Sequence, residues 1–226
     1  MRSFHQYNSK KMIETVLPIL KSNQIISLIS DAGTPTISDP GLDLIRACIE
    51  NSIKVYSIPG PSAVIASLVS SGISTDEFSF LGFAPRRNKE KKIFHERIIN
   101  AQETIIFFES PKRILKTLND LQIFLEGRRV SLVRELTKKN EEVINGTITN
   151  VLKKLEEKEK VLGEITVVIS ACSSGGLPEI SDHQILDSVK DLKVDNLSIS
   201  TMSKLIAEKY KVSKRRVYQL IIGNKR

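Results

Sequence analysis

Tryptophan is absent from the sequence, and only two cysteines, three histidines and 5% aromatic residues occur among its 226 positions. Two cysteines, Cys48 and Cys172, cannot form a disulfide framework, and neither they nor the histidines show metal-ligand spacing. No uncharged apolar run reaches the roughly 18–20 residues that a membrane-spanning helix needs. The first residues also lack the apolar core of a secretory signal. These absences argue against a secreted disulfide-rich protein and a membrane protein, and they predict a cytoplasmic globular protein with no bound metal.

Basic residues are concentrated in two places. The chain holds 34 Lys and Arg against 26 Asp and Glu, a net charge of +8. Residues 85–97 contain six basic and two acidic residues, and residues 202–226 contain eight basic and one acidic, which leaves the remainder slightly acidic. Two separate basic surfaces favour a polyanionic partner such as RNA, although either one alone is equally well a solvated helix face. The candidate RNA-binding residues are Arg86, Arg87, Lys89, Lys91, Lys92, Lys214, Arg215 and Arg216.

Apolar runs of strand length alternate with helical periodicity along residues 1–172. Residues 25–30 (IISLIS) and 53–58 (IKVYSI) are predicted to be buried strands, and helices at 40–51 and 61–71 imply parallel crossovers. The second half predicts a mixed sheet. It begins with the apolar segment 78–83 and is expected to contain strands at 103–109, 129–135 and 164–170, a short segment near 143–149, and helices at 89–100, 111–125 and 150–159.

Composition divides the chain into four parts. Residues 173–178 (SSGGLP) are typical of a linker, and residues 182–226 show only helical patterns. We therefore predict an N-terminal α/β domain at 1–74, a second α/β domain at 75–172, a linker at 173–181 and a basic helical C-terminal domain at 182–226. Two short helices in the last part, 203–211 and 213–223, resemble a helix-turn-helix whose second helix would contact a phosphate backbone.

Three loops that follow predicted strands have a construction suited to ligand binding. They are DAGTPTISDPG at 31–41, PGPSA at 59–63 and ESPKR at 109–113. In open α/β sheets, ligands bind beyond the carboxyl ends of the strands, and Gly and Pro fix a backbone that a ligand can approach closely. For PGPSA and ESPKR alone, a structural helix start is the better interpretation. Neither a G-x-G-x-x-G fingerprint nor a Walker lysine motif is present, so dinucleotide and triphosphate binding are not indicated.

Six motifs, taken in order, resemble the ribosomal RNA small subunit methyltransferase I family of the tetrapyrrole-methylase superfamily. They are SDAGTPTISDPG (30–41), IPGPSA (58–63), TDEFSFLGFAPR (75–86), FFESPKR (107–113), RELTKKNEEVINGT (134–147) and GEITVVI (163–169). The resemblance implies an α/β, two-domain tetrapyrrole-methylase-like fold, with a parallel-sheet domain, a mixed-sheet domain and a small helical C-terminal domain. It also implies S-adenosyl-L-methionine-dependent 2′-O-methylation of a cytidine ribose in the decoding centre of 16S rRNA.

The same resemblance implies a methyl-donor site in a cleft between the two α/β domains. The residues implied to bind S-adenosyl-L-methionine are Asp31, Ala32, Gly33, Thr34, Pro35, Ser62, Ala63, Phe108, Leu136, Gly163, Glu164 and Ile165. A ribose hydroxyl is a poor nucleophile, so a base or a cation that stabilises the developing alkoxide is expected. By charge and position, the catalytic candidates are Glu109, Arg134, Glu135 and Lys138. A structural ion-pair network is an equally good interpretation of each of them.

The chain departs from the family's pattern in two places. Lys112 stands where the family commonly has histidine, so no role for that imidazole is transferred. The family also opens with a strand and a TPIGN-like loop, whereas this sequence begins near SFHQYN at 3–8. Because that strand would be central in a parallel sheet, we expect a truncated or split gene product, either impaired or completed by a separately encoded N-terminal segment. The superfamily resemblance further implies a homodimer.

Three functions stay open from the sequence. The leading one is the rRNA methyltransferase, with 16S rRNA or the small ribosomal subunit as partner. The second is a methylase of a corrinoid or another small molecule, which would have no use for two basic surfaces. The third is a non-catalytic RNA-binding remnant of the enzyme, which would keep a salt-dependent affinity for RNA without binding the donor.

Overall fold

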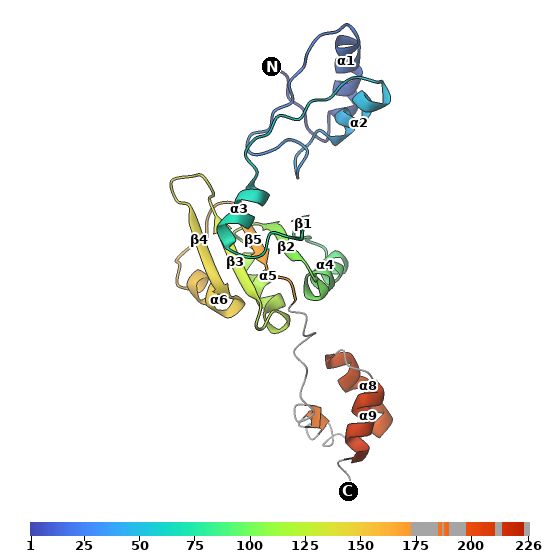
Figure 1. The fold of residues 1–226 in the computed structure, drawn as a ribbon, viewed down its shortest axis with the longest axis vertical. Helices are drawn as coiled ribbons and strands as arrows, with labels where there is room; N and C mark the ends of the chain where they lie inside the picture. Colours follow the sequence, from blue (N-terminus) through green and yellow to red (C-terminus); the bar gives the residue numbers. More distant parts are fainter. Residues whose placement is uncertain (173–184, 187, 190–197, 211–213, 224–226) are drawn as a thin grey trace. The chain divides into compact units, whose positions relative to one another are not determined.

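A five-stranded sheet organises the first of two units, Met1–Cys172, and helices make up what is described of the second, Ser173–Arg226 (Figure 1). The structure is a computed structural model that describes residues 1–172, 185–186, 188–189, 198–210 and 214–223. Of residues 208–210 and 214–216, only the backbone is described. The four-part division expected from the sequence stays a prediction.

The sheet has the strand order β1-β2-β5-β3-β4. Strands β1 and β2 are parallel, and all other neighbours are antiparallel, which is the mixed sheet predicted from the sequence. The central strands β2 and β5 are almost completely buried, as expected for apolar runs with neighbours on both sides. The strands are β1 (Phe78–Phe83), β2 (Thr104–Glu109), β3 (Arg129–Arg134), β4 (Glu142–Thr147) and β5 (Ile165–Ile169).

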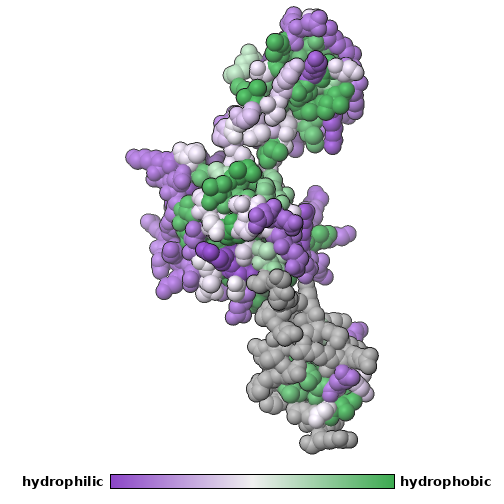
Figure 2. Space-filling model, in the orientation of Figure 1, coloured by the Kyte–Doolittle hydropathy of each residue, from purple (hydrophilic) through white to green (hydrophobic). Residues whose placement is uncertain are grey.

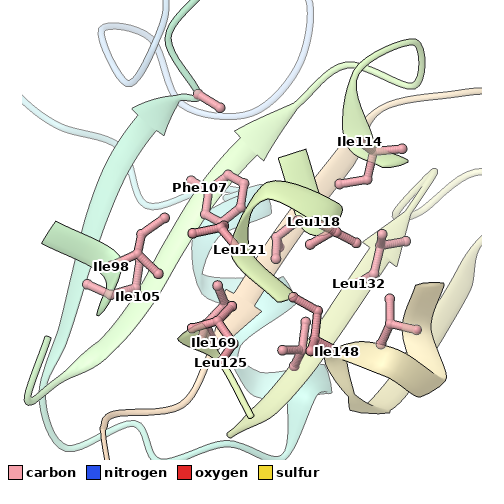
Figure 3. Close-up of a cluster of buried hydrophobic side chains, with 14 of the residues drawn as sticks. Ile98, Ile105, Phe107, Ile114, Leu118, Leu121, Leu125, Leu132, Ile148 and Ile169 are labelled. Atoms are coloured by element: carbon pink, nitrogen blue, oxygen red, sulfur yellow. The ribbon is translucent and has the colours of Figure 1, made fainter. Parts of the chain in front are cut away.

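Helices cover both faces of the sheet. On one face lies α3 (Ala63–Ser71), whose Val64 and Leu68 belong to one apolar cluster with Ile106 and Val168 of the strands. The larger core lies on the other face, where buried side chains of three helices interleave with those of the strands (Figure 3). These helices are α4 (Asn88–Asn100), α5 (Ile114–Leu121), which continues into the 3-10 turn η1 (Gln122–Phe124), and α6 (Ile148–Glu156).

Residues 1–62 contain two helices, α1 (Ser9–Lys21) and α2 (Leu42–Glu50). The helices pack against each other through Val16, Leu44 and Cys48. Helix α1 was not predicted from the sequence, whereas α2 lies within the predicted segment 40–51. Apolar side chains are exposed among polar ones on the visible face of this part of the chain (Figure 2).

The predicted strands at 25–30 and 53–58 are wrong. Both segments are irregular, and within residues 1–172, all of which the structure describes, no backbone hydrogen bond pairs either segment with a strand. Ile25, Ile29 and Ile58 are 95%, 71% and 82% exposed. A strand needs backbone hydrogen bonds to a neighbouring strand. The apolar composition of these two segments alone is therefore not sufficient to make them strands. The parallel sheet expected in residues 1–74 is therefore not formed here.

The described part of the second unit contains α8 (Ile199–Tyr210) and α9 (Lys214–Gly223). The two helices share a small apolar core that includes Met202, Ile206, Val217 and Ile221. The two predicted tail helices are thus confirmed, while the turn at 211–213 and the predicted linker at 173–181 lie outside the described residues. The α/β fold class is confirmed, and no helix in the described part of the chain is long and apolar enough to cross a membrane.

Candidate functional site

Most of the predicted site residues between 75 and 172 gather at one edge of the sheet. Glu109 and Arg134 pair with Ile165 from either side, so the ends of β2 and β3 meet the start of β5. The β3–β4 loop and the turn before β5 leave from this edge. They carry Glu135, Leu136, Lys138, Gly163 and Glu164.

The Glu109 carboxylate is buried, and each of its oxygens has a partner. Its Oε1 accepts the N–H of Ser110 at 2.6 Å and pairs with Nη2 of Arg113 at 2.5 Å. Its Oε2 accepts the hydroxyl of Thr117 at 2.7 Å. Arg113 also donates to the carbonyl of Ala84 at 3.0 Å. Through these partners, the Glu109 carboxylate connects the ends of β1 and β2 to α5 and to the turn before it.

A second group of charges locks the β3–β4 loop to the turn before β5. Glu135 Oε1 accepts from Nζ of Lys138 at 3.0 Å and from the N–H of Glu164 at 2.9 Å. Lys138 Nζ also donates to Oε2 of Glu164 at 3.2 Å. Glu135 has a left-handed backbone, with φ of 52°, and a Cβ added at Gly163 would collide with the Glu135 side chain. The loop and the turn therefore depend on each other.

These contacts shift the pKa values of both ionisable partners. The N–H of Glu164, and next the ammonium of Lys138, lower the pKa of Glu135 below its ordinary value. The carboxylates of Glu135 and Glu164 raise the pKa of Lys138. At neutral pH the arrangement therefore holds a weakly basic carboxylate beside a persistent, half-exposed ammonium group.

Arg134 belongs to a neighbouring set of ion pairs. Its Nε lies 3.1 Å from Oε2 of Glu142, and Nζ of Lys158 lies 2.7 Å from the other oxygen of that carboxylate. Burial raises the pKa of Glu142, but the hydrogen bonds from Lys158 and Arg134 outweigh this effect and lower it. A hollow of about 460 Å³ opens beside these pairs. It is lined by Arg134, Glu135, Asn140, Glu141, Glu142 and Leu162.

The predicted donor-binding residues of the N-terminal part form a second group. The hydroxyl of Thr34 donates to the carbonyl of Pro61 at 3.0 Å, which joins the loop 31–35 to the loop before α3. Ser62 is the N-cap of α3 and accepts an N–H from its first turn. Asp31 and Gly33 are exposed, and Gly33 has a left-handed backbone with φ of 72°. The structure thus brings these two predicted loops together.

Five of the residues predicted to bind RNA lie after the end of β1. Arg86, Arg87, Lys89 and Lys92 are exposed, and Lys91 is half-buried. Helix α9 begins at Lys214, but the side chains of Lys214, Arg215 and Arg216 lie outside the described residues.

Two residues of this region, Arg113 and Thr117, were not predicted from the sequence. Arg113 stands four residues after Glu109. This spacing predicts an ion pair only when both residues lie in one helix, and Glu109 is the last residue of β2. Thr117 is eight residues from Glu109, and no sequence signal relates the two.

Comparison with known families assigns the chain. Residues 2–152 match the family model described as Tetrapyrrole (Corrin/Porphyrin) Methylases. A ribosomal RNA small subunit methyltransferase I from Synechocystis sp. is 38% identical over 219 residues, which cover 96% of this chain and 78% of the relative. The chain belongs to the ribosomal RNA small subunit methyltransferase I family. Members of this family from Haemophilus influenzae and Thermotoga maritima are 37% and 40% identical, over 96% and 74% of this chain and 77% and 75% of their own.

Solved structures agree with this family at the level of the fold. The methyltransferase CobJ superposes with a TM-score of 0.53 and 15% identity, over 71% of this chain and 70% of its own. Diphthine synthase superposes with a TM-score of 0.52 and 16% identity, over 73% of this chain and 65% of its own. The tetrapyrrole-methylase-like fold predicted for this member of the ribosomal RNA small subunit methyltransferase I family is thereby confirmed.

Proposed function

We propose that the chain transfers the methyl group of S-adenosyl-L-methionine to the 2′-oxygen of a cytidine ribose in the decoding centre of 16S rRNA, in the cytoplasm. The observation that carries this proposal is the 38% identity, over 219 residues, to a relative named ribosomal RNA small subunit methyltransferase I. The exposed basic residues after β1 support 16S rRNA, free or in the small ribosomal subunit, as the partner.

The residues proposed to hold the donor have suitable chemistry. The loop that begins at Asp31 presents an exposed carboxylate and exposed backbone groups, and the hydrogen bond from Thr34 to Pro61 fixes its position. The ammonium and ribose hydroxyls of the donor need acceptors of this kind. When bound, the donor supplies an electrophilic methyl group. The residues proposed to contact it are Asp31, Ala32, Gly33, Thr34, Pro35, Ser62, Ala63, Phe108, Leu136, Gly163, Glu164 and Ile165.

Among the catalytic candidates, Lys138 is the best suited to act on the ribose hydroxyl. Its side chain is 46% exposed, and two carboxylates keep its ammonium protonated by raising its pKa. A cation that is already fixed in place stabilises a developing alkoxide without reorganisation. Glu135, whose lowered pKa makes it a weak base, positions Lys138. Glu109 and Arg134 have their charges paired within the protein and serve as positioning residues.

Two assays on the full chain test the function. Calorimetric titration with S-adenosyl-L-methionine measures donor binding, and transfer of a labelled methyl group to unmodified small ribosomal subunits measures activity. Saturable binding and a 2′-O-methylated cytidine in 16S rRNA are the expected results. Donor binding with methylation of a corrinoid and not of RNA would support the small-molecule alternative. Salt-dependent RNA binding without donor binding would support the non-catalytic remnant.

Substitution of Lys138 tests its role, and substitution of the neighbouring, exposed Lys139 is the matched control. Lys138→Ala is expected to lower kcat by about 100-fold or more, because it removes the cation, while donor affinity stays within a few-fold. Lys139→Ala should leave kcat nearly unchanged. Equal losses from both substitutions would reject a specific role for Lys138.

Two further proposals concern protein partners. We propose that the chain forms a homodimer, which sedimentation velocity tests by the mass of the species in solution.

We also propose that a separately encoded N-terminal segment pairs with the irregular segments 25–30 and 53–58, whose apolar side chains are exposed. Co-expression with the corresponding segment of the Synechocystis relative should raise the Tm and protect amides of these two segments from exchange. A monomeric species in sedimentation would reject the homodimer. Unchanged amide hydrogen exchange in segments 25–30 and 53–58 would reject pairing with the N-terminal segment.

A further inference from the structure

An exposed aromatic ring lies at the end of β1, beside the basic residues. Phe83 is 59% exposed, although its ring contacts that of Phe108 edge to face, with 5.3 Å between the centroids and 62° between the planes. Phe80 contacts Phe108 in the same manner, at 4.8 Å. A phenyl ring gains free energy when it is covered, so the exposed ring of Phe83 is a candidate contact surface.

A β-bulge places the ring in this position. From Phe80 to Phe83, strand β1 advances by three residues, while its partner β2 advances by two, from Ile106 to Phe108. In a regular strand, Phe80 and Phe83 would lie on opposite faces of the sheet. The extra residue brings both rings to the face that carries Phe108. Gly82, with φ of 70°, permits the backbone conformation that this bulge needs.

The backbone that follows the ring is held in place. The N–H of Ala84 donates to the end of β2 at 2.9 Å, and Arg113 donates to the carbonyls of Ala84 and Pro85 at 3.0 and 3.3 Å. Arg86 and Arg87 follow directly, and both are exposed. The ring and two guanidinium groups therefore leave from one fixed stretch of chain.

We propose that Phe83 stacks on an unpaired base of the RNA substrate while Arg86 and Arg87 contact the adjoining phosphates. This inference rests on the RNA partner of the proposed function. Aromatic rings beside basic groups bind single strands with little sequence preference, because every base has a π-face and every nucleotide a phosphate. The adenine of the methyl donor also has a π-face. The positive charge beside the ring, however, favours a polyanionic strand over a sulfonium compound with a net positive charge.

Because the chain has no tryptophan, Phe83→Trp introduces a single indole, whose fluorescence can be excited selectively over that of the four tyrosines. A single-stranded, uridine-rich oligoribonucleotide should quench the emission of this variant with saturation, because a stacked base contacts the indole. Inorganic polyphosphate, which has charge but no bases, should not quench it. Phe78→Trp is the matched control, since Phe78 lies at the other end of the same strand and is 40% exposed. Its emission should not respond to the RNA.

Affinity measurements complete the test. Phe83→Ala is expected to weaken binding of the oligoribonucleotide about 5- to 100-fold at fixed salt, and Phe83→Tyr should restore most of the affinity. Fluorescence anisotropy of a labelled strand measures both, and circular dichroism shows that each variant is folded.

Three results would overturn the inference, each with a different meaning. RNA binding without a response of the indole would show that the ring is no stacking platform, while the RNA partner would stand. A saturable response to S-adenosyl-L-methionine alone would assign the ring to the donor site. No RNA binding by the unaltered chain would reject the partner proposed above, whatever the donor assays show.

Discussion

Glu109 and Arg113 form an ion pair with 2.5 Å between Oε1 and Nη2, and the side chain of Glu109 is completely buried. A buried pair is costly to break, because removal of one partner leaves an uncompensated charge in the protein interior. Arg113 extends the pair to the Ala84 carbonyl, so the backbone before the basic residues Arg86 and Arg87 depends on it as well.

Replacement of Glu109 is therefore expected to lower the free energy of unfolding strongly. Glu109→Ala should cost about 3–5 kcal/mol, and Thr117→Val, which removes one hydrogen bond to the carboxylate, about 1.5–3 kcal/mol. Urea denaturation followed by circular dichroism measures both changes. Arg87→Ala removes an exposed pair with Glu90 and is the control, with little expected change. Similar losses in Glu109→Ala and the control would contradict a special role for the buried pair.

Arg128 joins the ends of three elements through backbone carbonyls. Its Nε and Nη2 donate to the carbonyl of Ser170 after β5, and its Nη1 donates to the carbonyl of Ile98 in the last turn of α4 at 2.7 Å. Burial lowers the pKa of this guanidinium. The residue itself directly precedes β3, so one planar group fixes α4, β3 and β5 relative to each other.

Arg128→Lys is expected to lower the free energy of unfolding by about 2–3 kcal/mol, because an ammonium group cannot reproduce a guanidinium fork. The matched control is Arg129→Lys, at the neighbouring exposed position, which should change stability little. Thermal denaturation at neutral pH compares the two. If both variants melted together, the planar geometry of Arg128 would not matter for stability.

The sequence predicts an element well when the chain also contains that element's partners. The apolar segment 78–83 coincides with β1, and α6 buries Ile148, Val151 and Leu155 with helical spacing. Segments 25–30 and 53–58 have the same apolar character as the true strands, but they are not paired with a neighbour. Periodicity reports what a segment can bury, and it does not report whether a neighbouring strand is present.

The candidate site could be predicted in part. Charge and position select Glu109, Arg134, Glu135 and Lys138, and an ion-pair network is an equally good interpretation of each of them. The structure contains ion pairs for all four. The register that aligns β2, β5 and β3 brings these residues to one edge, and register is set by tertiary pairing. The left-handed backbone of Glu135 could not be predicted from the sequence either, because such conformations in residues other than glycine depend on their surroundings.

The network of Glu135 and Lys138 predicts stabilisation that depends on pH. A lowered pKa in the folded state means that Glu135 adds stability above its unfolded pKa, and that this is lost as the pH falls through the folded pKa. A raised pKa means that Lys138 adds stability below its unfolded pKa, and that this is lost as the pH rises through the folded pKa. The network should therefore stabilise the chain around neutral pH. This stabilisation should fade as the pH falls below 4.5, the ordinary pKa of glutamate, and as it rises above 10.5, the ordinary pKa of lysine.

Urea unfolding midpoints of the unaltered chain and Glu135→Gln test the acidic limit. The difference between the two should be largest near neutral pH, should shrink as the pH falls below the ordinary glutamate pKa of 4.5, and should vanish once the carboxylate is protonated in the folded chain. Glu156→Gln, on the exposed face of α6, is the control and should show no such dependence. A difference that does not shrink as the pH falls below that value would show that the charge of Glu135 is not what stabilises the loop.

Gly163 is expected to be the least replaceable glycine at the candidate site. It has φ of 91°, and an added Cβ would collide with the side chain of Glu135, so Gly163→Ala suffers both backbone strain and crowding. Gly127 has φ of 78° with nothing within 4 Å of an added Cβ, so Gly127→Ala suffers strain alone. Gly163→Ala should therefore lower the free energy of unfolding by about 1–3 kcal/mol more than Gly127→Ala. Urea denaturation measures the difference, and equal costs would mean that Glu135 moves aside freely and is not locked to the turn before β5.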